Sequence, residues 1–179
     1  MRLLLPNKVY NKVTDINLTE LRQLGITGLL LDLDNTLVKW DSEEMDPEFM
    51  VWIEQVKALG FKLCLVSNGK PQRVQRFAQL FNIPAVIKAF KPKRTPFRRA
   101  LELLKLDRKQ VAMIGDQLFT DVLGANRLGI YTILISPLGK NELRTTKFMR
   151  RLEQRMLRRF VNKGLLNPEI ISTRNGGTK

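Results

Sequence analysis

Histidine is absent from this chain of 179 residues, and cysteine occurs once, at Cys64. The absence of histidine excludes histidine triads and histidine-ligated zinc, so acid–base chemistry near neutral pH must use carboxylates, lysine, cysteine or a metal-bound water. One cysteine cannot form an internal disulfide, and we expect a cytoplasmic protein. No apolar run approaches the roughly 18 residues that cross a bilayer, and the leading leucines end at Pro6. We therefore predict neither a transmembrane segment nor a secretory signal.

Acidic residues are scarce relative to basic ones. The chain has 17 Asp and Glu against 31 Lys and Arg, a formal net charge of +14. This surplus favours a polyanionic partner, which could be RNA, a ribosome or an acidic phospholipid surface, although a merely solvated basic surface is the plainer interpretation. With 44% hydrophobic residues the chain can bury one substantial core, and we expect a single domain over residues 1–179.

Short apolar runs alternate with helical patterns along most of the chain. The apolar runs cover residues 26–33, 61–66, 85–87, 111–114 and 130–135, and the helical patterns cover residues 47–59, 71–82, 95–105 and 119–128. Strands that alternate with helices in this way are typical of a parallel sheet covered on both faces. We predict a three-layer α/β, Rossmann-like fold with about five parallel strands. A capping box at residues 17–20 adds a short helix before them.

The C-terminal part of the chain differs in composition. Residues 140–163 contain nine basic residues against two glutamates, and their pattern predicts a basic helix. Apolar residues recur every fourth position there, at Phe148, Leu152, Met156 and Phe160. This stripe either docks on the sheet domain or binds an acidic surface. The polar, Gly-rich residues 172–179 are expected to be disordered.

Polar residues end four of the predicted strands. The carboxyl ends of parallel strands share one edge of the sheet, so these side chains should converge. Several buried carboxylates need a compensating cation, and oxygen ligands without histidine favour Mg²⁺. A carboxylate beside the metal can attack phosphorus while the metal and a lysine absorb the negative charge. The residues are Asp32, Asp34, Ser67, Asn68, Lys91, Asp116 and Asp121.

These residues resemble, in the same order, the four motifs of the haloacid dehalogenase (HAD) superfamily. The matching segments are residues 32–36 (Asp-Leu-Asp-Asn-Thr), Ser67, Lys91-Pro92 and residues 115–121 (Gly-Asp-Gln-Leu-Phe-Thr-Asp). The resemblance covers about residues 26–136 and is similar to the subclass IIIA, YqeG-like phosphatases, which in turn resemble phosphatidylglycerophosphate phosphatases. It implies a phosphoric monoester hydrolase that uses Mg²⁺. The gaps between motifs hold one helix each, which leaves no room for a cap domain.

The resemblance also implies roles in the chemistry. Asp32 would be the nucleophile that becomes an aspartyl-phosphate, and Asp34 would protonate the leaving group and activate water. The phosphoryl group would be bound by Ser67, Asn68 and Lys91.

The metal ligands follow from the same resemblance. They would be Asp32, Asp34 through its backbone carbonyl, and Asp116. Asp121 would orient Lys91 or a metal-bound water, and its role rests on the weakest part of the pattern.

Three alternatives compete with this interpretation. A cysteine phosphatase needs an arginine six residues after its nucleophile, whereas Lys70 stands there relative to Cys64, so a buried core thiol is the simpler role. A phospho-accepting receiver domain would place its acidic pair on the first strand and its acceptor alone on a middle strand. A ribosome- or RNA-associated protein of HAD fold, with a different or vestigial phosphatase activity, would explain the charge. A lipid substrate would instead place the protein peripherally at the inner membrane face.

Overall fold

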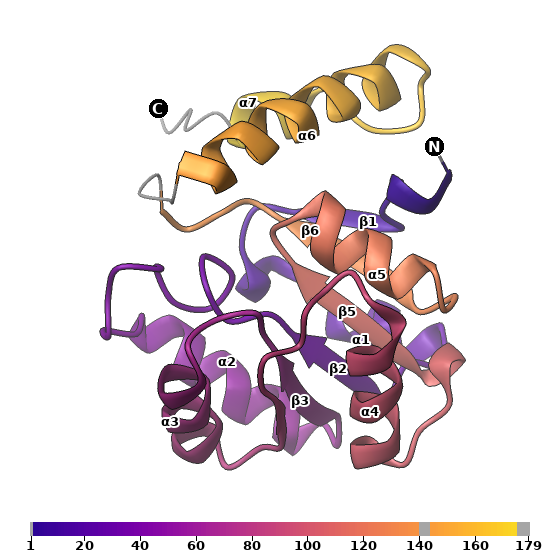
Figure 1. Cartoon of the computed structure of the whole chain (residues 1–179). Coiled ribbons are helices and arrows are strands. Elements are labelled where there is room, and N and C mark those ends of the chain that lie inside the picture. Colours follow the sequence, from indigo (N-terminus) through magenta and orange to yellow (C-terminus); the bar gives the residue numbers. More distant parts are fainter. Residues whose placement is uncertain (1, 140–143, 175–179) are drawn as a thin grey trace.

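Six parallel strands form one sheet within residues 2–139 and 144–174, the residues that the computed structural model describes (Figure 1). Their order is β1-β6-β5-β2-β3-β4, and every neighbouring pair runs parallel. The strands are β1 (Lys8–Tyr10), β2 (Gly28–Leu31), β3 (Lys62–Val66), β4 (Ala85–Val86), β5 (Val111–Gly115) and β6 (Tyr131–Ile135). The strand order reverses at β2: β3 and β4 lie on one side of it, and β5, β6 and β1 lie on the other. Open α/β sheets place their functional sites at such a switch point.

The helices of the described ranges begin at local sequence signals. The Asn17 side chain caps α1 by accepting a hydrogen bond of 3.0 Å from the Glu20 amide, and prolines occupy the first positions of α2 and α3. The helices are α1 (Leu18–Gln23), α2 (Pro47–Ala58), α3 (Pro71–Phe81), α4 (Arg94–Leu104), α5 (Leu123–Asn126), α6 (Arg144–Asn162) and α7 (Glu169–Arg174). Short 3₁₀ turns cover Arg2–Leu4, Val13–Asp15 and Arg108–Gln110, and a π-helical turn, η4, covers Leu118–Val122. None of the described helices is both long and apolar enough to span a membrane.

Alternate residues of the central strand face opposite layers. Leu29 and Leu31 of β2 belong to a core cluster that includes Trp52 of α2 and Phe77 of α3. Leu30, between them, belongs to a second cluster that includes Phe97 of α4. The side chains of a strand alternate in this way, so one short apolar run supplies the cores on both sides of the sheet. The predicted three-layer arrangement is confirmed.

The prediction of about five strands requires one addition. All five predicted strands are present, and each lies within its predicted run or ends one residue beyond it. β1 was not predicted because it has only three residues and none of them is buried. The pattern predicted as one helix over 119–128 is instead η4 followed by α5. One α-helix lies between β2 and β3 and one between β4 and β5, so no cap domain occupies these described segments.

Helix α6 docks on the sheet domain. Its Leu157 and Phe160 are buried in a cluster with Leu118 of η4 and Leu134 of β6, which confirms the docking alternative. Docking does not extend to the start of the predicted stripe, because Phe148 is 60% exposed. The expected disorder is wrong up to Arg174, where α7 ends, and the other residues of that tail lie outside the described residues, as do residues 140–143.

Candidate active site

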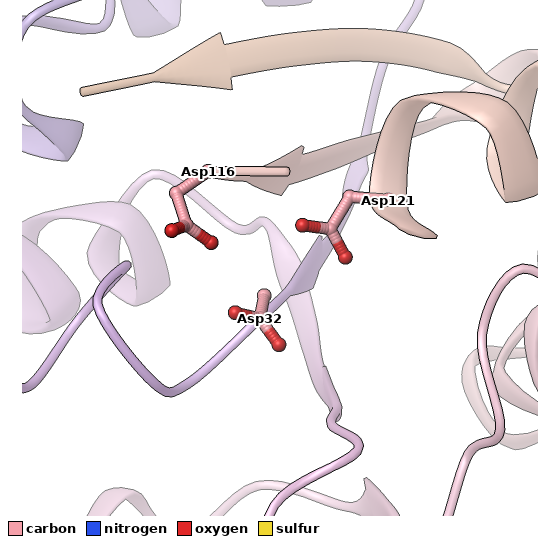
Figure 2. A group of neighbouring side chains, drawn as sticks. All are labelled: Asp32, Asp116 and Asp121. Atoms are coloured by element: carbon pink, nitrogen blue, oxygen red, sulfur yellow. The ribbon is translucent and has the colours of Figure 1, made fainter. Parts of the chain in front are cut away.

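Three buried carboxylates meet at the carboxyl edge of the sheet. Asp32 follows β2, Asp116 follows β5 and Asp121 lies in η4. One carboxylate oxygen from each lies within 4.8 Å of the others, and Figure 2 shows the three side chains turned toward one another. The predicted convergence of these residues is therefore present, and its cause is the parallel pairing of β2 with β5.

Lys91 lies between two of these carboxylates. Its Nζ is 2.6 Å from Asp32 Oδ1 and 2.7 Å from Asp121 Oδ1, and its side chain is almost fully buried. Asn68 holds the backbone of this residue, because its Oδ1 accepts from the Lys91 amide at 2.8 Å and its Nδ2 donates to the Lys91 carbonyl at 3.3 Å. Asn68, predicted to bind phosphate, thus fixes Lys91 in this structure.

The loop after β2 brings further polar groups to the same edge. The Thr36 hydroxyl lies 3.1 Å from Asp32 Oδ2 and 3.3 Å from Asp116 Oδ1, a contact that sequence reasoning missed. Ser67 is buried after β3, and its Oγ accepts from the Gly69 amide at 3.0 Å. A Cβ at Gly69 would lie 2.4 Å from Asp34 Oδ2, so only glycine allows this approach.

Two arginines complete the site, and neither was predicted. Arg73 of α3 donates from Nε to Asp34 Oδ1 at 2.9 Å, and its other nitrogens bind the loop after β2, including the Lys39 carbonyl at 2.9 Å. Arg150 of α6 binds the Asp116 carboxylate and donates to the Asp116 carbonyl at 2.6 Å. Neither arginine directly follows a strand or lies in one of the four matching segments, so sequence reasoning had no signal for these pairings.

Comparison with known proteins places this chain in a family. A family model described as "haloacid dehalogenase-like hydrolase" matches residues 12–129. The chain belongs to this family of hydrolases. It is 38% identical over 160 residues to "Probable phosphatase YqeG" of Bacillus subtilis (strain 168), which covers 89% of this chain and 93% of that protein. It is 29% identical to "Phosphatidylglycerophosphate phosphatase 1, chloroplastic/mitochondrial" of Arabidopsis thaliana over 90% of this chain and 49% of that protein.

Solved structures agree with the HAD-like fold. An uncharacterized protein from Listeria monocytogenes serotype 4b superposes with a TM-score of 0.52 at 24% identity, covering 66% of this chain and 85% of that chain. A Had-superfamily hydrolase from Ehrlichia chaffeensis gives a TM-score of 0.51 at 16% identity, covering 71% and 97% respectively. At these identities the likeness concerns the fold alone.

Burial dominates the electrostatics of this HAD-like site. It raises the pKa of Asp32 to about 8 although Lys91 opposes the shift, and Asp121 and Asp116 add to it. It raises the pKa of Asp121 as well, again against Lys91. Burial lowers the pKa of Lys91, but the charges of Asp121 and Asp32 outweigh this and the net shift is upward. Lys91 contacts both Asp32 and Asp121, and Arg150 contacts Asp116, so each of the three carboxylates has a basic side chain beside it.

The residues present fit a hard divalent cation. Three carboxylates offer oxygen ligands within 4.8 Å of one another, the donor type that Mg²⁺ prefers, and a bound cation would favour their ionised forms. Cys64 takes no part in this cluster, because it is buried beside Phe97 in the core. Burial raises the pKa of its thiol to about 12, so the thiol stays protonated and a cysteine nucleophile is excluded.

Proposed function

We propose that this protein is a Mg²⁺-dependent phosphatase that hydrolyses a phosphate monoester through an aspartyl-phosphate on Asp32. The observation that carries the proposal is the buried contact of 2.6 Å between Asp32 Oδ1 and Lys91 Nζ, set among two further carboxylates. The lysine can neutralise phosphoryl oxygens next to the attacking carboxylate. The similarity to a protein named as a phosphatase supports the same reaction.

The chain's own residues account for the proton transfers. The Asp32 carboxylate attacks phosphorus, the ester P–O bond breaks, and Asp34 gives its proton to the leaving oxygen. Asp34 then takes a proton from the water that attacks the aspartyl-phosphate, which releases inorganic phosphate and restores Asp32. Burial raises the pKa of Asp34 although Arg73 opposes it, which suits a group that must carry a proton. Ser67 and Lys91 would bind the phosphoryl oxygens.

Asp32, Asp116 and the Asp34 backbone carbonyl would hold the metal. When bound, Mg²⁺ would act as a Lewis acid that stabilises charge on the transferring phosphoryl group. The leaving group would lie in a cavity of about 490 Å³ that opens beside Asp34 and is also lined by Trp40, Lys70 and Arg76.

Removal of the metal tests the reaction. With p-nitrophenyl phosphate as a generic monoester, we expect turnover with Mg²⁺ to fall at least about a hundredfold in excess EDTA, because the Lewis acid supplies several kcal/mol of charge stabilisation. Adding back Mg²⁺ beyond the chelator should restore the rate, whereas unchanged turnover in EDTA would contradict the proposal. RNA binding without any turnover would favour the ribosome- or RNA-associated alternative.

The substrate that we propose is a phosphate monoester on an acidic phospholipid surface, with phosphatidylglycerophosphate as the specific candidate. Among the described residues, the exposed aromatic side chains are those of Trp40, Phe90 and Phe148. Trp40 lines the same cavity as Asp34, Phe90 directly precedes Lys91 in the sequence, and Phe148 belongs to α6, the helix that carries Arg150. Aromatic side chains beside an uncapped site can enter the interface of a bilayer.

Exposed basic residues lie close to Phe90 in the sequence. They are Lys88, Lys93, Arg94, Arg98 and Arg99, and the Lys93 ammonium lies 5.7 Å from the centre of the Phe90 ring. Basic residues near an acidic membrane contribute roughly 1 kcal/mol each. The Arabidopsis relative named for phosphatidylglycerophosphate supports the lipid candidate, although the alignment spans about half of that protein. Aromatic and basic groups together also suit single-stranded RNA, which keeps RNA as the competing partner.

Vesicle binding separates the two partners. We expect the protein to co-sediment with phosphatidylglycerol vesicles at low salt and not to bind phosphatidylcholine vesicles. Binding to the acidic vesicles should weaken as the salt concentration rises. Lys93→Gln combined with Arg94→Gln should weaken binding by on the order of tenfold or more, from roughly 1 kcal/mol per charge. Lys109→Gln, an exposed change in the turn before β5, is the matched control. Binding to RNA but not to acidic vesicles would assign the basic residues to nucleic acid.

A further inference from the structure

We infer that Arg150 of α6 is a positioning residue that holds Asp116 in the orientation required to bind the metal. The inference rests on the metal site of the proposed function. It also joins that site to a helix beyond residue 129, where the match to the family model ends.

The Arg150 guanidinium binds one residue at two places. One nitrogen donates to the Asp116 backbone carbonyl at 2.6 Å and another binds the Asp116 Oδ2. Asp116 is fully buried and the Arg150 side chain is 14% exposed. A planar guanidinium that spans the carbonyl and the carboxylate of one residue restricts rotation of the side chain relative to the backbone.

The contact leaves the other carboxylate oxygen directed at the nucleophile. Asp116 Oδ1 lies 3.3 Å from the Thr36 hydroxyl, which is 3.1 Å from Asp32 Oδ2. Arg150 thus binds Oδ2, the outer oxygen of Asp116, while Oδ1, the inner oxygen, lies on the side of Asp32. A hydrogen-bond partner on the oxygen that does not face the metal fixes the orientation of a ligating carboxylate. Less conformational freedom is then lost when the metal binds.

Helix α6 is anchored so that it can deliver this arginine. Glu153 is buried, accepts from the Leu118 amide at 2.7 Å through Oε1, and accepts from Arg150 at 3.0 Å through Oε2. Leu157 packs in the same cluster as Leu118, in the turn that follows Asp116. The helix and the loop that carries Asp116 therefore pack together, with Arg150 and Glu153 as polar links between them.

A cation beside a metal ligand can act in two opposite ways. It can position the carboxylate, in which case its loss weakens metal binding, or it can compete with the metal for the carboxylate, in which case its loss strengthens binding. The position of Arg150 on the outer oxygen favours the first, and the sign of the change in affinity distinguishes them.

Calorimetric titration of Mg²⁺ into the metal-free full chain, without substrate, tests the inference. We expect Arg150→Gln to weaken Mg²⁺ binding by about tenfold or more, the usual effect of removing a group that orients a metal ligand. Arg150→Lys, which keeps the charge but lacks the planar fork, should give an intermediate affinity. Arg151→Gln makes the same charge change at an exposed position of α6 and should leave the affinity unchanged.

Circular dichroism must show that each variant is folded before its affinity is compared. If Arg150→Gln does not fold, Glu153→Gln is the second test: its amide oxygen still accepts from Leu118, but the charge that holds Arg150 is lost, and a severalfold weaker affinity is expected. An unchanged or tighter affinity in any folded Arg150→Gln protein, or in Glu153→Gln, would overturn the inference. If the wild type itself binds no Mg²⁺, the proposed function fails instead.

Discussion

Asp32→Asn should abolish turnover of phosphate monoesters while the protein stays folded. The carboxamide has nearly the same shape but cannot attack phosphorus, so no aspartyl-phosphate forms. Loss of a covalent nucleophile lowers the rate by on the order of 10⁴-fold or more. The fold should survive because Asp32 is one of three carboxylates crowded at the site, and burial already disfavours its charge. Lys91 keeps Asp121 as a partner at 2.7 Å.

The measurement combines three readouts on the same preparation. Turnover of p-nitrophenyl phosphate and trapping of an acid-stable phosphoenzyme should both be lost, and the circular dichroism spectrum should match that of the wild type. Asp107→Asn, at an exposed position before the turn that precedes β5, is the matched control and should retain both activities. A wild-type rate in Asp32→Asn would remove Asp32 from the mechanism.

Lys91→Ala should lower the rate per folded molecule by on the order of a hundredfold or more, because an ammonium that stabilises phosphoryl oxygens is lost. The same change should lower the free energy of unfolding by about 3 kcal/mol or more, since breaking a buried ion pair leaves charge without compensation. Asp32 and Asp121 both lose their 2.6–2.7 Å contacts with the lysine.

The two effects of Lys91→Ala need separate measurements. Urea unfolding gives the stability, and turnover divided by the folded fraction gives the catalytic effect. Lys109→Ala is the control, because Lys109 is exposed in the turn Arg108–Gln110 and takes no part in the proposed site. A loss of stability with an unaltered rate per folded molecule would show that Lys91 is structural.

The sequence by itself predicted the layers of the fold and the convergence of four polar residues at one edge of the sheet. The apolar runs are short and bounded, so the strands could be located, and the parallel arrangement follows from the helices between them. Asp32, Lys91, Asp116 and Asp121 could be predicted to converge because each follows a strand or the turn after it. Local chain direction is enough to bring such residues to one edge.

Only the tertiary structure decided the contacts made between distant surfaces. β1 has too few apolar residues to be recognised locally and exists because β6 offers an unpaired edge. Arg73 and Arg150 look like ordinary helix-surface cations in the sequence, yet they bind Asp34 and Asp116 because α3 and α6 pack beside the site. Helical periodicity predicts an apolar stripe but not the rotation at which a helix docks, which packing against other side chains decides. For that reason the sequence alone predicted a basic C-terminal helix, and only its packing on the sheet domain revealed that one of its arginines reaches Asp116.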